Sequence, residues 1–155
     1  MSTDFENAKF ISMHLHKLAS LTDRLSAHIL KSGFNLSFPQ FFILMALKKR
    51  GDISQTAIAQ YHGLTESAIS KQIAMLQKIQ FLRKTINTRN RREHILQLTP
   101  KGSKVVNEAM KKLGEQFVKI FNVLPKNQQK LFGENLEKIT VSADFFVKQY
   151  PSFTK

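Results

Sequence analysis

The segment from Ser54 to Thr99 carries signals for two short helices and a hairpin in a fixed order, and few folds accommodate that order. Ser54 can begin the first helix, because a serine hydroxyl accepts hydrogen bonds from the free N–H groups of a first helical turn. The residues His62-Gly63-Leu64 then supply a turn, and Thr65 can cap a second helix that we expect to run to about Gln80. The sequence therefore predicts two helices joined by a short turn.

The second of these helices has two chemically different faces. Its apolar residues recur at steps of three and four, which predicts one buried stripe made of Ala68, Ile69, Ile73, Leu76 and Ile79. Near the opposite face, at the N-terminal end, lie small or polar side chains and one cation: Glu66, Ser67, Ser70, Lys71 and Gln72. Such side chains suit a helix that reads base edges in the major groove of DNA. An ordinary amphipathic helix has the same pattern, so the helix by itself leaves both interpretations open.

After this helix the periodicity changes from helical to alternating. Residues 81–86 alternate loosely, and residues 94–99 alternate more regularly, with Leu96 and Leu98 facing inward. The loop between them contains three arginines, Arg89, Arg91 and Arg92. This pattern predicts a β-hairpin, or wing, whose basic tip is either a solvated loop or a contact to a polyanion. Its place directly after a helix-turn-helix favours the polyanion.

The formal net charge of +13 is concentrated in the middle of the chain. Residues 48–104 carry twelve basic and three acidic side chains, whereas residues 1–47 carry four and three, and residues 105–155 carry eight and five. A charge excess that only kept the protein in solution would be spread more evenly. The distribution indicates an anionic partner docked on the middle segment, with a polynucleotide as the leading candidate.

Long helices are predicted on both sides of this segment. Residues 4–31 contain neither proline nor glycine and carry a near-continuous helical stripe of apolar side chains. Ser37-Phe38-Pro39-Gln40 matches a capping box with proline in the first turn, so a helix should follow and end at Lys48-Lys49-Arg50-Gly51. Asp52-Ile53 could form a very short strand.

The C-terminal part is also expected to be helical. Thr99 and Pro100 have the chemistry of a cap and a first helical residue, and the apolar periodicity then continues to Phe121. Leu124-Pro125 breaks this helix, and a last one is expected over residues 127–149. The predicted fold class is therefore mainly α with a minor β part: a winged helix-turn-helix with a two-stranded wing, flanked by N- and C-terminal helices.

Composition excludes several kinds of protein. A chain of 155 residues fits one domain with a real core. The absence of cysteine excludes disulfides, thiol catalysis and thiolate zinc sites. No apolar run approaches the roughly 20 residues of a membrane span, and the N-terminus does not resemble a signal peptide. We therefore expect a cytoplasmic protein.

The sequence also lacks the usual signals of catalysis. It contains no Gly-rich phosphate loop, no nucleophile elbow and no paired carboxylates, so an enzyme is not expected. The five histidines are scattered, and His14 and His16, two positions apart, would diverge on a helix. We predict no metal site and no cofactor.

The order of elements and the residues in them resemble the MarR family of winged-helix transcription regulators. The matching segments are Ser37–Leu44, Ser54–Ala59, Leu64–Lys71, Arg91-Arg92 and Leu98–Gly102. They correspond in turn to the family's capped second helix, first helix of the helix-turn-helix, recognition helix, wing and start of the fifth helix. The resemblance is strong over residues 37–104, whereas the flanking helices match only by length and position.

Three positions depart from the family pattern. The family usually has an aspartate two residues before the wing arginine, where this chain has Asn90, and an earlier acidic wing position is Asn87. Asparagine can accept a hydrogen bond but supplies no charge, so Arg92 should be less firmly held for the minor groove. The family's glycine after the recognition helix is Gln80 in this chain, which predicts a strained or differently closed helix exit.

The resemblance implies a homodimer bound to double-stranded DNA. Residues 1–36 and 105–155 would form the helical dimerisation region and residues 37–104 the DNA-binding region, in one continuous domain. Each recognition helix would enter a major groove of a pseudo-palindromic operator, and each wing an adjacent minor groove. The expected DNA-binding residues are Ser54, Gln55, Thr65, Ser67, Ser70, Lys71, Gln72, Arg89, Arg91 and Arg92. Repression is the commonest mode in the family.

The resemblance also implies that a small molecule, often an aromatic acid, can release the DNA. Candidate effector-binding residues are Phe10, His14, Phe41, Phe42 and Met45. Aromatic residues at helical spacing more often belong to a hydrophobic core, and this second interpretation is favoured.

Two binding functions other than operator reading are compatible with a basic winged helix. The first is a protein- or RNA-interaction module, since a fold does not fix a function. The second is a cationic protein of the membrane surface, which is disfavoured because the basic residues lie on a helix–hairpin segment and not on one amphipathic helix. Duplex DNA, structured RNA and liposomes would separate these alternatives.

Overall fold

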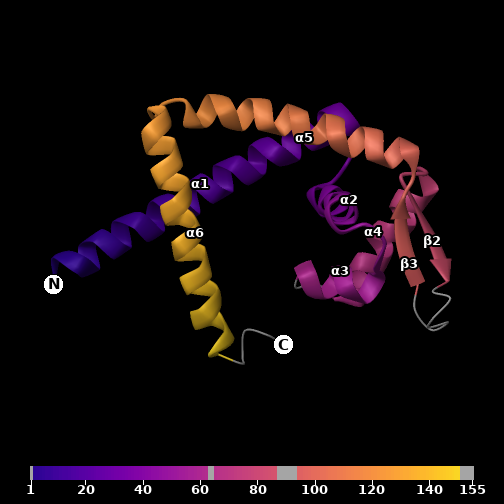
Figure 1. Cartoon of the computed structure of the whole chain (residues 1–155), viewed down its shortest axis with the longest axis horizontal. Helices are drawn as coiled ribbons and strands as arrows, with labels where there is room; N and C mark the ends of the chain where they lie inside the picture. The colour runs from indigo at the N-terminus through magenta and orange to yellow at the C-terminus, as the bar shows by residue number, and fades with distance from the viewer. Residues whose placement is uncertain (1, 63–64, 87–93, 151–155) are drawn as a thin grey trace. The chain divides into compact units, whose positions relative to one another are not determined.

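The computed structural model has the element order of a winged helix-turn-helix between long helices (Figure 1). It describes residues 2–62, 65–86 and 94–150. The elements are α1 (Thr3–Phe34), α2 (Phe38–Arg50), β1 (Ile53–Ser54), α3 (Gln55–His62), α4 (Glu66–Lys78), β2 (Leu82–Ile86), β3 (His94–Leu98), α5 (Pro100–Phe121) and α6 (Lys126–Lys148). The chain divides into two compact units, Met1–Leu113 and Gly114–Lys155, and α5 continues from the first into the second. The predicted fold class is confirmed.

The caps predicted from the sequence are all formed. In each case the hydroxyl of Ser37, Ser54, Thr65 or Thr99 accepts a hydrogen bond from the backbone N–H three residues further on, at 3.0–3.4 Å. At the start of α2 the Gln40 side chain also accepts from the Ser37 N–H at 2.9 Å, which completes the capping box. These local contacts fix where α2, α3, α4 and α5 begin.

A small antiparallel sheet with the strand order β1-β3-β2 forms the wing. In β2 and β3, Leu82 lies opposite Leu98 and Ile86 lies opposite His94, which confirms the predicted hairpin. The very short strand expected at Asp52-Ile53 is present one residue later, as β1, where Ile53 lies opposite Leu96. Leu96 is fully buried and Leu98 half-buried.

The hydrophobic core of the first unit is formed by α2, α3, α4 and the sheet, with further buried side chains from α1 and α5. Its largest fully buried side chains are Leu30, Leu36, Ile43, Leu44, Ile58, Ile69, Ile73, Leu76, Leu96 and Val106. The core therefore lies directly behind the helix-turn-helix and fixes its orientation.

The buried stripe of α4 is narrower than the sequence predicted. Ile69, Ile73 and Leu76 are buried, but Ala68 is exposed and Ile79 is 37% exposed, so their assignment to the stripe is wrong. Successive helical residues are about 100° apart, which places Ala68 and Ile79 on one flank of the helix, well away from Ile69.

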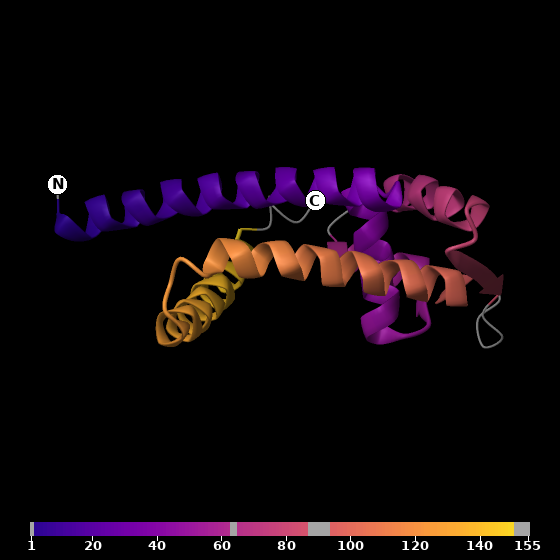
Figure 2. The same cartoon turned by 90° about the horizontal axis from the view of Figure 1, so that it is seen from above.

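Parts of the long helices expose apolar surface. α1 is one unbroken helix (Figure 2), and every residue from Ser2 to His14 is exposed. In the second unit, α6 contains no buried residue. The exposed large apolar side chains of α6 are Leu131, Phe132, Ile139, Val141, Phe145, Phe146 and Val147. None of the described helices is long and apolar enough to cross a membrane.

Candidate nucleic-acid interface

The N-terminal part of α4 presents polar side chains to solvent. Thr65, Ser67, Ser70 and Lys71 are exposed, and Gln72 is half-buried. Ile69 and Ile73 lie on the other side of the same turns and are buried. The core therefore holds the helix by one face and leaves the small hydroxyls and the ammonium group free on the other. This arrangement suits a helix that enters the major groove.

The N-terminus of α3 offers a second polar contact. Ser54 and Gln55 are both half-buried there, and the Ser54 hydroxyl accepts the Ala57 N–H at 3.1 Å. The Gln55 side-chain oxygen accepts a hydrogen bond from the Lys84 ammonium group of β2 at 3.3 Å. The first N–H groups of a helix attract an anion such as phosphate, and a nearby ammonium group adds to that attraction.

Lys84 was not among the residues singled out in the sequence. The period of two along a strand could have identified it, because Lys84 falls on the same face of β2 as the buried Leu82 and so points toward the helices instead of away from them. It is half-buried, and its charge is thereby fixed beside the start of α3.

A side-chain contact joins the two helices of the helix-turn-helix. The Thr56 hydroxyl of α3 donates a hydrogen bond to the Glu66 carboxylate of α4 at 3.0 Å. Both side chains are exposed. The bond links the first turns of α3 and α4, which are the two helix ends expected to face DNA, and it keeps the carboxylate engaged beside α3.

The predicted wing contacts fall outside the part of the chain that the structure describes. Arg89, Arg91 and Arg92 lie between Ile86, where β2 ends, and His94, where β3 begins. The departures at Asn87 and Asn90 lie there too, and the roles of all five residues stay predictions.

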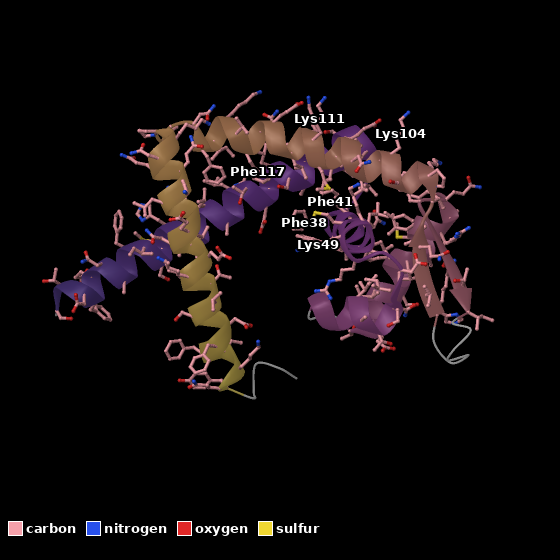
Figure 3. The ribbon with its side chains drawn as sticks, viewed as in Figure 1. Phe38, Phe41, Lys49, Lys104, Lys111 and Phe117 are labelled. Atoms are coloured by element: carbon pink, nitrogen blue, oxygen red, sulfur yellow. The ribbon has the colours of Figure 1, made fainter. Side chains whose placement is uncertain are left out.

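The candidate effector residues fall into two groups on two helices. On α2, Phe41 is 4% exposed and its ring centroid is 6.3 Å from that of Phe42. Figure 3 shows Phe38 and Phe41 projecting from α2, and the Phe38 ring packs edge-on against Phe42 with a centroid distance of 4.5 Å. These contacts are typical of a hydrophobic core.

The second group lies on the exposed part of α1. Phe10 and His14 are both exposed, and their ring centroids are 4.1 Å apart. Ser26 and Leu30, the buried residues of α1, lie further along it, so at 1.5 Å per residue about 18 Å of helix separates His14 from Ser26. An effector site that uses both groups stays a prediction, as does the half-buried Met45 as part of it.

The described part of the chain contains no candidate metal-binding site. Over residues 2–62, 65–86 and 94–150, no three side chains of histidine, aspartate or glutamate gather in a way that could hold an ion.

Comparison with known proteins supports the same fold and family. Residues 36–94 match the model of the MarR family. A relative from Bacillus subtilis (strain 168), described as the uncharacterized HTH-type transcriptional regulator YwaE, is 28% identical over 130 residues, which are 83% of this chain and 75% of the relative.

Two solved structures extend the similarity over most of the chain. The crystal structure of the transcriptional regulator BldR from Sulfolobus solfataricus has a TM-score of 0.76 and 25% identity, covering 92% of this chain and 99% of that chain. Sco3205, a MarR family transcriptional regulator from Streptomyces coelicolor solved in complex with DNA, has a TM-score of 0.74 and 21% identity, covering 85% of this chain and 84% of that chain.

The fold and the capped, exposed α4 define a winged helix-turn-helix protein. Residues 36–94, which run from just before α2 to the first residue of β3, match the MarR family model, so this segment is similar to the MarR transcriptional regulators. The resemblance seen in the sequence over residues 37–104 is therefore confirmed over residues 37–94 of that segment.

Proposed function

We propose that this protein is a sequence-specific regulator of transcription that binds double-stranded DNA as a homodimer. The observation that carries the proposal is the N-terminal half of α4. Thr65 caps it, the core holds it from one side, and Ser67, Ser70 and Lys71 are exposed on the other side. The cationic middle of the chain supplies the attraction to phosphate. Binding of DNA by the Streptomyces coelicolor relative supports this choice of ligand.

The proposed contacts divide into those that read bases and those that bind the backbone. Ser67, Ser70, Lys71 and Gln72 of α4 contact base edges or flanking phosphates in the major groove. Ser54 and Gln55 bind a phosphate at the start of α3, and Thr65 can donate to another. Arg92 enters the minor groove with Arg89 and Arg91 on nearby phosphates, and we carry this over from the family resemblance.

The exposed apolar surface supports a homodimer. Residues 1–36 and 105–155 form the proposed dimerisation region, which includes the exposed part of α1 and all of α6. On α6, four residues at steps of four, three and seven follow one side of the helix: Phe132, Leu136, Ile139 and Phe146. Three of them, Phe132, Ile139 and Phe146, are 37%, 47% and 57% exposed. A second copy of the chain would cover such a stripe.

A symmetric dimer places two recognition helices on one side of a duplex. The expected operator is a pseudo-palindrome with half-sites about 34–36 Å apart, one helical turn of DNA. Repression, and release by an aromatic acid bound near Phe41, Phe42 and Met45 of α2 with Phe10 and His14, stay predictions from the family resemblance.

Binding-site selection from random duplexes with the purified protein tests the proposal. The expected result is a pseudo-palindromic motif, which also gives the half-site spacing. A structured RNA of similar length is the competing ligand. Tighter binding to the RNA, or selection of no duplex motif, would favour the alternative of an RNA- or protein-interaction module.

A further inference from the structure

The C-terminal end of α4 is held by the N-terminal turn of α5. We call this contact the α4–α5 junction and define it by Ile79, Gln80 and Phe81 on one side and Thr99, Lys101 and Gly102 on the other. The junction lies at the C-terminal end of α4. Thr65 and the polar turn that we propose to face DNA lie at the N-terminal end. The junction therefore does not belong to the surface that we propose to touch DNA.

One hydroxyl group serves both helices at this junction. The Thr99 hydroxyl donates a hydrogen bond to the Gln80 carbonyl oxygen at 2.7 Å and accepts one from the Gly102 N–H at 3.0 Å. The Thr99 N–H also donates to the Phe81 carbonyl oxygen at 3.1 Å. The same side chain thus caps the start of α5 and occupies a free carbonyl just beyond the end of α4.

Lys101 adds a charged contact to the same helix end. Its ammonium group donates a hydrogen bond to the Ile79 carbonyl oxygen at 3.0 Å and lies 5.3 Å from the centroid of the Phe81 ring. The last carbonyl groups of a helix lack partners within the helix and carry its negative dipole end, so a cation is favourable there. The ring contributes a further attraction to the cation.

The two backbones meet at a distance that leaves no room for a side chain at Gly102. A Cβ atom added to Gly102 would lie 1.8 Å from the Phe81 carbonyl oxygen. Between the two helix ends, Gln80 has a φ of 62°, in the left-handed region. The close backbone contact prevents the two segments from moving closer together, and the hydrogen bonds of Thr99 and Lys101 oppose their separation.

We propose that Thr99 and Lys101 are positioning residues that fix the angle between α4 and α5 and thereby set the operator spacing that the dimer accepts. The proposal rests on the proposed function. α5 runs without a break from the junction to Phe121, in the region proposed to bind the second copy. The orientation of each recognition helix is therefore tied to residues 105–113 of α5, which lie in the same unit as α4 and belong to the proposed dimerisation region.

Two lysine variants of α5 provide a matched test. Lys101→Met removes the donor and the charge but keeps an unbranched apolar stem over Phe81. Lys104→Met removes the same charge from the same helix, where Lys104 is exposed and projects away from α2 (Figure 3). Duplexes selected by the unaltered protein would be remade with the half-site spacing lengthened or shortened by one base pair. Dissociation constants would be measured for each duplex at several salt concentrations.

We expect the unaltered protein and Lys104→Met to prefer the selected spacing equally. Lys101→Met should lose roughly three- to tenfold of that preference, because a loosened α4 can follow displaced half-sites. Its salt dependence should equal that of Lys104→Met, and Lys101→Arg, which keeps the donor, should restore the preference. Thr99→Val and Thr99→Ser provide a second pair. Thr99→Val removes the hydroxyl group, and Thr99→Ser is the control that keeps it.

Three results would count against the proposal in different ways. An unchanged spacing preference in both Lys101→Met and Thr99→Val would overturn the positioning role alone. A salt slope lowered in Lys101→Met beyond that of Lys104→Met, with the spacing preference intact, would make Lys101 a phosphate contact instead. Failure of the unaltered protein to select any duplex would overturn the proposed function itself.

Discussion

At the residue scale, the α4–α5 junction requires a glycine at one position, Gly102, and lacks one at another, Gln80, where the backbone conformation favours it. Gly102 allows the backbone of α5 to approach the Phe81 carbonyl, where any side chain would collide. Gln80 adopts a left-handed φ of 62°, a conformation that glycine adopts without strain. The sequence predicted the second feature from the missing family glycine, whereas the first is visible only in three dimensions.

Gly102→Ala should destabilise the protein by about 1–3 kcal/mol, because the added methyl group must displace the backbone at Phe81. Gly33→Ala is the control, since nothing lies within 4 Å of a Cβ at Gly33 in the last turns of α1. The control should be neutral or stabilising by less than about 1 kcal/mol. Urea unfolding at one protein concentration measures both changes. Equal stabilities would mean that the α4–α5 junction is wider than described.

Gln80→Gly should stabilise the protein by about 0.5–1 kcal/mol, because it removes the left-handed strain of a residue with a Cβ atom. Gln77→Gly, three residues earlier and inside α4, should instead destabilise it by about 1 kcal/mol through lost helix propensity. The two substitutions are identical in chemistry and differ only in backbone conformation. Thermal unfolding that moves the midpoint in the same direction for both would contradict the left-handed assignment.

At the element scale, the two ends of α4 have different tasks. The N-terminal end presents Ser67, Ser70 and Lys71, and the C-terminal end is fastened to α5. Lys71, the sixth of the 13 residues of α4, and Lys78, the last, are both exposed. Substitution of each of these two lysines therefore tests which part of α4 contacts DNA.

Lys71→Ala should weaken binding to a selected duplex and lower the salt slope by about one unit, because one phosphate or base contact is lost at the DNA-facing end. Lys78→Ala removes an equal charge from the last turn of α4 and should change the slope much less. Fluorescence anisotropy titrations over a range of salt concentrations provide both slopes. Similar slopes for the two variants would place the duplex elsewhere on the protein.

At the scale of the whole molecule, the described chain leaves the apolar side chains of α6 uncovered. α6 has no buried residue, although it carries phenylalanines, isoleucine and leucine on one side. Exposure of these apolar side chains to water is unfavourable in free energy. A second copy of the chain provides an apolar surface that can cover them. The dimer is accordingly the assembly in which we expect the recognition helices to work.

Phe146→Lys should shift the protein from dimer to monomer, because it places a charge in the proposed contact stripe of α6. Sedimentation equilibrium would then report 17.8 kDa in place of twice that mass. Glu137→Lys, also exposed but outside the stripe, introduces the same side chain and should leave the dimer intact. A dimer that survives Phe146→Lys would show that this face of α6 is not the contact.

What could be predicted from the sequence was local in origin. Each helix cap is a contact between residues three positions apart, so the local sequence is sufficient to predict it. The caps are those of Ser37, Ser54, Thr65 and Thr99. The hairpin followed from alternation over a few residues. The family pattern lies in this same segment, which explains why the resemblance and the local signals agreed.

The contacts that orient these elements were decided only by the tertiary structure. Thr56 meets Glu66 across 10 positions, Lys101 reaches Ile79 across 22, and Lys84 reaches Gln55 across 29. No periodicity joins residues so far apart, because their meeting depends on how the core packs whole helices and strands together. The same packing narrowed the buried stripe of α4. The sequence alone determined where each helix begins and what its faces carry, and packing decided which of those faces meet.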